Sequence, residues 1–197
     1  GPHLIYLPER VFEIDLKPDS QQRDRIYPSL SRIGDGWLIY APQLLPPEAS
    51  GQPHDVSYSL PDGWVVLAPT DDGGDIELDG WVFVGPPALI ESGAANVAIA
   101  PATPAWLRKE VLDAANSAAE FFGKRLGIEL EAKPGIVLSV YPEDRSNSVR
   151  GDVTPGAIMS VRFYGEAWTG YDPGAADQVR ELLAHEFFHF WNGGIAS

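Results

Sequence analysis

Short hydrophobic runs separated by turn-forming residues occupy the first half of the chain. Some runs alternate apolar and polar side chains, and others are continuous stretches of aliphatic and aromatic residues, as is typical of strands. They lie at residues 10–16, 36–42, 55–60, 63–69, 76–85 and 96–101. Glycine, proline, aspartate and serine are common between them. The pattern predicts a mainly β N-terminal domain over residues 1–100, built like a β-sandwich.

The spacing of the hydrophobic residues becomes helical after Pro101. Residues 103–127 predict a helix with Thr103 as its N-cap, Pro104 at its first position and Gly127 at its end. The apolar positions on one face of this helix are Leu107, Val111, Ala115, Ala118, Phe122 and Leu126. We expect that face to pack into the core rather than to bind a cofactor.

Two strands and a second helix are expected after this first helix. The strands are predicted at residues 135–142 and 157–165, with a polar loop at 143–156 between them. The second helix starts near Asp172 and runs through His189. The order helix, strand, strand, helix predicts an α/β (α+β) domain over residues 101–197.

Composition narrows the classes of function. Of the 197 residues 44% are hydrophobic, which is enough for a sizeable core. Asp and Glu total 28 against 14 Lys and Arg, and the net charge of -14 argues against nucleic acid as a partner. No hydrophobic run reaches the roughly 20 residues of a membrane span. The absence of cysteine excludes disulfides and thiolate ligands but fits either an oxidising or a reducing compartment, so the localisation stays open.

The strongest functional signal is an H-E-x-x-H sequence formed by His185, Glu186 and His189 on the second predicted helix. Residues four apart lie on one face of a helix, so both imidazoles can bind one metal ion, and zinc accepts that geometry. Glu186 is offset by one residue, which suits a general base acting on a water beside the metal. The alternative is that both histidines are packed helix residues that bind no metal.

The residues around this motif resemble one family of zinc peptidases. The segment HEFFHFWN, at 185–192, is similar to the zinc-helix signature H-E-[FY]-F-H-x-W-N of the glycyl aminopeptidase family. YSLPDGW, at 58–64, resembles a strand and turn of that family's N-terminal β-domain. The resemblance implies a β-sandwich followed by the first part of a thermolysin-like catalytic domain of the gluzincin type. It further implies that His185 and His189 bind zinc, that Glu186 is the catalytic base, and that water activated by the metal hydrolyses peptide bonds.

The family pattern also includes a third zinc ligand, which is a Glu on the helix that follows. Here only eight residues follow His189, and none of them is acidic. We therefore expect the third ligand beyond Ser197, which makes this chain the N-terminal part of a longer zinc peptidase. Residues 1–197 alone are then expected to be inactive.

The segment before the zinc helix departs from the family pattern as well. Relatives carry a G-G-x-E-H-like segment there, and its Glu helps to hold the substrate amino terminus. This sequence has Gly156, Ala157 and Met159 at the corresponding place, and these are the expected substrate-binding residues. The strand at 157–165 is expected to form the sheet edge onto which a peptide substrate adds. Without the acidic anchor, the choice between exopeptidase and endopeptidase activity stays open.

Two interpretations without catalysis remain. The chain can be a binding or structural module that keeps a relic H-E-x-x-H helix and binds no metal. Alternatively, six Trp and seven Tyr can belong to a β-sandwich that binds carbohydrate or protein, although core packing explains scattered aromatic residues more simply. Without the helices expected beyond Ser197, the face that carries His185 and Glu186 is expected to expose Phe or Trp surface, which would favour self-association of the chain.

Overall fold

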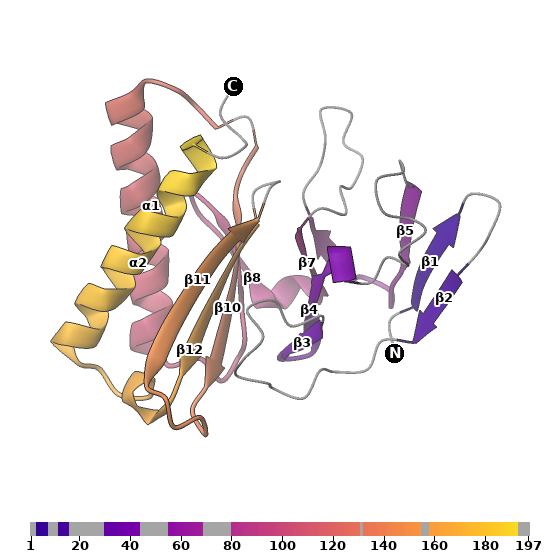
Figure 1. The fold of residues 1–197 in the computed structure, drawn as a ribbon, viewed down its shortest axis with the longest axis horizontal. Coiled ribbons are helices and arrows are strands. Elements are labelled where there is room, and N and C mark those ends of the chain that lie inside the picture. Colours follow the sequence, from indigo (N-terminus) through magenta and orange to yellow (C-terminus); the bar gives the residue numbers. More distant parts are fainter. Residues whose placement is uncertain are drawn as a thin grey trace.

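Helices and sheets form layers in this protein (Figure 1). Helices α1 (Ala105–Leu126) and α2 (Pro173–Asn192) cover one face of a five-stranded sheet, and a four-stranded sheet packs against its other face. The computed structural model describes residues 3–7, 12–15, 30–43, 55–68, 80–130, 132–154 and 158–192. Their mixture of helices and strands fits the α+β description expected from the sequence.

The five-stranded sheet is the frame that carries both helices. In sheet order its strands are β11 (Ser148–Thr154), β12 (Ile158–Tyr164), β10 (Gly135–Tyr141), β9 (Asn96–Ile99) and β8 (Ile90–Ser92). β10 is parallel to β9 and β12, whereas the edge strands β11 and β8 are antiparallel to their neighbours. β8 and β9 precede Pro101, so this sheet begins before the hydrophobic spacing changes.

The other strands described form two antiparallel sheets. The four-stranded sheet has the order β3 (Leu30–Ile33), β4 (Gly36–Tyr40), β7 (Trp81–Gly85) and β6 (Val65–Leu67). The three-stranded sheet has the order β2 (Phe12–Asp15), β1 (His3–Leu7) and β5 (Asp55–Ser59). The hydrophobic runs therefore predict β2, β4, β5, β6, β7 and β9, but they do not predict β1, β3 or β8.

The start of α1 differs by one residue from the prediction, and its end is as predicted. Pro104, rather than Thr103, is the N-cap, and its carbonyl accepts the first helical hydrogen bond, from the N–H of Arg108 at 3.0 Å. Gly127 ends the helix with a φ of 67°, a left-handed conformation that glycine adopts without steric cost. The expected apolar face is buried at Leu107, Val111, Ala115 and Ala118, whereas Phe122 is half-buried and Leu126 is exposed.

The largest core lies between the helices and the five-stranded sheet. It contains Val111 and Ala115 of α1, Val179, Leu183, Phe187 and Phe190 of α2, and Met159, Val161 and Phe163 of β12. A second core between the two sheets contains Ile33, Leu38, Trp81, Phe83, Val137 and Ile158. Burial of one such side chain stabilises the fold by roughly 1.5–3 kcal/mol, so both helices are held firmly on the sheet. No helix among the described residues is long and apolar enough to cross a bilayer.

Candidate metal centre

Helix α2 carries His185, Glu186 and His189, as the sequence predicts. The helix begins at Asp172, whose Oδ1 accepts a hydrogen bond from the N–H of Ala175 at 2.9 Å. Its buried residues, which fix its orientation on the sheet, include Val179, Leu183, Phe187 and Phe190. With that face buried, His185 is exposed, His189 is half-buried and Glu186 is directed towards the sheet.

The two histidine side chains approach each other at the surface of α2. Their Nε2 atoms are 3.4 Å apart, and the ring planes are inclined at 85°. Two imidazole nitrogens that bind one tetrahedral zinc ion at about 2.0–2.1 Å are themselves about 3.3–3.4 Å apart. The separation of the two nitrogens therefore fits a shared zinc ion.

Asn192 orients the second histidine. Nδ1 of His189 lies 3.2 Å from Oδ1 of Asn192, one helical turn further along α2. An amide oxygen can only accept a hydrogen bond, so this contact requires the proton on Nδ1 and leaves the lone pair of His189 on Nε2. That tautomer is the one in which Nε2 can bind a metal.

Glu186 lies against strand β11. The residue is 9% exposed, which is unusual for a glutamate. A Cβ atom added to Gly151 of β11 would lie 2.6 Å from Cγ of Glu186 and 3.0 Å from its Cδ and Oε1. Glycine at position 151 therefore provides the space that the side chain of Glu186 occupies.

The opposite face of β11 contacts the four-stranded sheet. Asp152, next to Gly151, forms an ion pair with Arg162 of β12, whose side chain is 1% exposed. The guanidinium carbon of Arg162 lies 5.7 Å from the ring centroid of Trp81 in β7. Two residues further along β11, Thr154 Oγ1 accepts a hydrogen bond from the backbone N–H of Trp81 at 3.1 Å.

An aromatic pair closes the end of the two neighbouring strands. Tyr141 of β10 and Tyr164 of β12 are stacked, with ring centroids 5.2 Å apart and planes at 19°. Burial raises the pKa of Tyr164 above its ordinary value, and the nearby guanidinium groups of Arg162 and Arg150 act in the opposite direction. Tyr164 is therefore a neutral phenol throughout the physiological pH range.

The described residues bring two candidate metal ligands together. No group of three or more His, Asp or Glu side chains is arranged to hold a metal ion within the part of the chain that the structure describes. Catalytic zinc sites normally have three protein ligands and one open position. His185 and His189 alone would therefore not make a complete catalytic zinc site.

Of the three residues expected to bind substrate, Met159 lies among the described residues. Gly156 and Ala157 lie outside the described residues. Met159 is fully buried in the core beneath the helices. The expectation that its strand forms the sheet edge is wrong, because β12 lies between β11 and β10 and bonds to both. The edge strand beside α2 is β11.

Sequence reasoning missed β11, which it assigned to a polar loop. Its residues do alternate: Val149 and Val153 pack against the helical core with Gly151 between them, while Asp152 and Thr154 contact the other face. This period of two is the signal of a strand. It is weak here because a glycine replaces one apolar residue, and charged residues flank that glycine.

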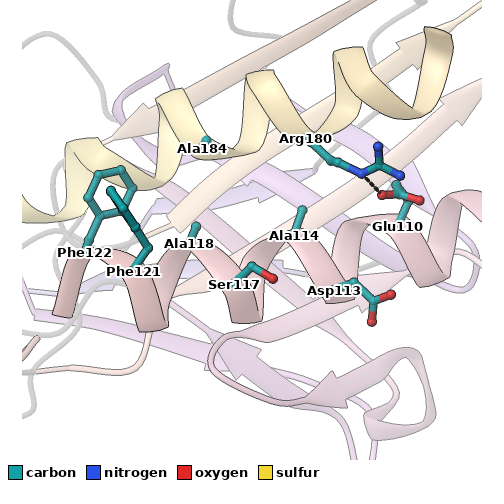
Figure 2. A pocket seen from close by; sticks show the side chains of 9 residues that line it. All are labelled: Glu110, Asp113, Ala114, Ser117, Ala118, Phe121, Phe122, Arg180 and Ala184. Atoms are coloured by element: carbon teal, nitrogen blue, oxygen red, sulfur yellow. Dashed lines mark hydrogen bonds and ion pairs between the residues drawn. The ribbon is translucent and has the colours of Figure 1, made fainter. Parts of the chain in front are cut away.

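A groove separates α1 from α2 on the outer surface of the helical layer (Figure 2). It has a volume of about 320 Å³, and Ala114, Ala118 and Ala184 line it. An ion pair between Arg180 and Glu110 lies at one end and the rings of Phe121 and Phe122 lie at the other, as Figure 2 shows. Phe121 and Phe188 leave aromatic surface exposed on this layer. The self-association expected from the sequence stays a prediction.

Comparisons with known proteins give no match to this chain. No protein-family model, no curated protein and no solved structure matches it significantly. The resemblance to glycyl aminopeptidases therefore rests on the zinc-helix residues and on the segment at 58–64.

Proposed function

We propose that this chain contributes the zinc helix and the general base of a zinc-dependent peptidase related to the glycyl aminopeptidases. The observation that carries the proposal is the 3.4 Å separation of the two Nε2 atoms, which fits two ligands of one zinc ion. Asn192 supports it by holding His189 in the metal-binding tautomer. On this proposal the layer of α1, α2 and the five-stranded sheet is the first part of a thermolysin-like catalytic domain.

The chemistry proposed is hydrolysis of a peptide bond. Zinc, when bound, supplies Lewis acidity that favours ionisation of water and polarises the scissile carbonyl. The carboxylate of Glu186 accepts a proton from the attacking water as the water oxygen bonds to the carbonyl carbon. The C–N bond then breaks, and Glu186 returns the proton to the leaving amine, so that it ends the cycle as a carboxylate.

A further protein ligand is part of the proposal. His185 and His189 provide two nitrogen ligands, and a catalytic zinc site needs one more from the protein. We place that ligand outside the described residues. The activity is accordingly proposed for the intact protein, with residues 1–197 alone expected to bind zinc weakly and to be inactive.

The peptide substrate is proposed to bind along β11. An edge strand has unpaired N–H and C=O groups along its free side, and an extended peptide can hydrogen-bond to them. β11 is the edge strand of its sheet, and Gly151 in its middle lies under Glu186. A peptide bound there would pass beside the general base.

The proposal is tested by measuring zinc content and peptide hydrolysis together in the intact protein. Glu186→Gln should keep zinc, because the amide has nearly the same shape and Glu186 is not a ligand, while turnover falls by roughly 10²–10⁴-fold. His185→Ala and His189→Ala should each lose zinc. Glu181→Gln, which removes an exposed carboxylate from the same helix, is the matched control and should keep both properties.

Each result decides between the open interpretations. Parent-level hydrolysis by Glu186→Gln would show that Glu186 is not the base. An intact protein that binds no zinc would instead support a module that keeps a relic helix. For the chain 1–197, submicromolar zinc affinity in calorimetry together with turnover would show that a carboxylate within these residues completes the site.

A further inference from the structure

Adjacent residues of β11 face opposite layers of the molecule. Gly151 faces α2, and the side chain of Glu186 packs against it. Asp152 faces the four-stranded sheet and forms an ion pair with Arg162. Successive side chains of a strand alternate between its two faces. The contact of Glu186 and the ion pair of Asp152 are therefore joined by a single peptide unit.

The ion pair is well buried. The side chain of Arg162 is 1% exposed and that of Asp152 is 16% exposed. A charge removed from water requires its counter-ion, because loss of one partner leaves the other desolvated and uncompensated. Arg162 also lies over the ring of Trp81, which is fully buried in the core between the two sheets. Asp152 is thereby tied through Arg162 to the four-stranded sheet.

A second link joins β11 to the same tryptophan. The backbone N–H of Trp81 donates to Oγ1 of Thr154 at the end of β11, and both groups are buried. Among the strands that the structure describes, β11 pairs with β12 alone. The two links to Trp81 therefore hold β11 through its face towards the four-stranded sheet, in addition to its pairing with β12.

Register is the property that these links determine. If β11 slipped by one residue against β12, every side chain would move to the other face of the sheet. Arg150 or Asp152 would then lie beneath Glu186 in place of Gly151. Its side chain would occupy the space that glycine leaves free. The same slip would separate Asp152 from Arg162 and break their ion pair. The ion pair consequently opposes the one displacement that would push Glu186 out of place.

We propose that Asp152 and Arg162 are positioning residues for Glu186, which act through the register of β11 and are anchored at Trp81. This inference rests on the proposed function, since it gives Glu186 a catalytic role. On this proposal the four-stranded sheet, through Trp81, fixes the position of β11 beneath Glu186. The ion pair thus serves the geometry of the general base rather than overall stability alone.

The test replaces the ion pair by apolar residues of similar size. The double variant Asp152→Leu/Arg162→Met removes both charges, a change that folded proteins often tolerate. We expect it to fold and bind zinc within about threefold of the parent, with KM changed little and kcat lowered about 10²-fold, as for a catalytic group displaced by about 1 Å. Leu89→Ala is the control, because Leu89 lies in the same core between the sheets, and it should lower stability while keeping kcat.

Two readouts do not depend on catalysis. In the double variant the amide protons of β11 should exchange faster, and the side-chain carboxyl carbon of Glu186 should change its NMR shift; neither change is expected in Leu89→Ala. Parent-like exchange, shift and kcat in the double variant would overturn the positioning role. Zinc-independent hydrolysis by the parent, or full activity of Glu186→Gln, would overturn the proposed function instead, so the two failures are distinguishable. The single variant Asp152→Asn, which removes the carboxylate that pairs with Arg162, should lower kcat further or prevent folding; stable folding with parent kcat would also count against the proposal.

Discussion

Glu186 rests on Gly151: a Cβ atom at position 151 would lie only 2.6 Å from Cγ of Glu186. Contacts of a Cβ atom below 3.0 Å essentially never occur. The proposed general base therefore packs directly against β11, a strand outside the H-E-x-x-H motif. Substitutions in β11 should affect the base as well as substitutions in α2.

Gly151→Ala should move the base without removing it. The added methyl group forces Glu186 or β11 to shift, so we expect kcat to fall by about 10²-fold while zinc affinity stays near the parent value. Steady-state kinetics and metal analysis measure the two quantities. Gly123→Ala in α1 is the matched control, because a Cβ atom there meets nothing within 4 Å. Unchanged kcat in Gly151→Ala would show that the contact has no functional importance.

Asn192 should affect the metal rather than the proton transfer. Asn192→Ala removes the acceptor for Nδ1 of His189, and loss of such a partner typically lowers metal affinity by about 10–100-fold. Asn192→Asp keeps an acceptor oxygen and should retain the affinity or raise it. Competition with a chromophoric chelator gives both values in the intact protein. Equal affinity in Asn192→Ala and the parent would mean that this hydrogen bond does not orient the ligand.

Free and N-blocked peptides should be hydrolysed at similar rates. The carboxylate of β11, Asp152, already pairs with Arg162 and faces away from α2, so it is not placed to hold a substrate amino terminus. We expect kcat/KM for matched acetylated and free peptides to agree within about threefold. A strong preference for the free amine would show that a carboxylate elsewhere in the protein provides the anchor.

Tyr164 should make the protein less stable in alkali. Burial raises the pKa of its phenol in the folded protein above the ordinary tyrosine value of 10.0, so the unfolded chain ionises first as pH rises. The contribution of Tyr164 is fully present below the unfolded pKa and is lost as pH rises through the folded one. Tyr164→Phe should therefore show a smaller fall in Tm between about pH 9.5 and 11.5 than the parent. Tyr171→Phe, at an exposed position, should behave like the parent. An identical fall in Tm for Tyr164→Phe and the parent would refute the assignment.

The sequence predicts elements well where one period of hydrophobic residues is long and uninterrupted. Val111 and Ala115 mark α1 in this way, and the capping group of Asp172 marks the start of α2, both as found. The H-E-x-x-H spacing likewise places His185 and His189 on one helix face, where their Nε2 atoms meet.

What the sequence does not predict depends on tertiary neighbours. The space at Gly151 is used only because α2 packs across β11, and the buried charge of Arg162 pairs with Asp152, which is brought to it by the pairing of β11 with β12. Met159 has the pattern of a buried strand residue, but its pattern does not reveal that its strand is internal rather than at the edge. Strand order is a property of the whole sheet, and it decides which backbone is free to receive a peptide.

The place of β8 and β9 in the five-stranded sheet limits how this protein can be divided by recombination. A cut at Pro101, where the sequence changes character, would remove both strands and expose the flank of β10, whose residues Ile136 to Leu138 are fully buried. A free hydrophobic edge of that kind invites pairing with other chains and aggregation. A chimera that exchanges the N-terminal sheets is better joined between β7 and β8, near Pro86. All five strands of the sheet beneath the two helices then come from the same parent.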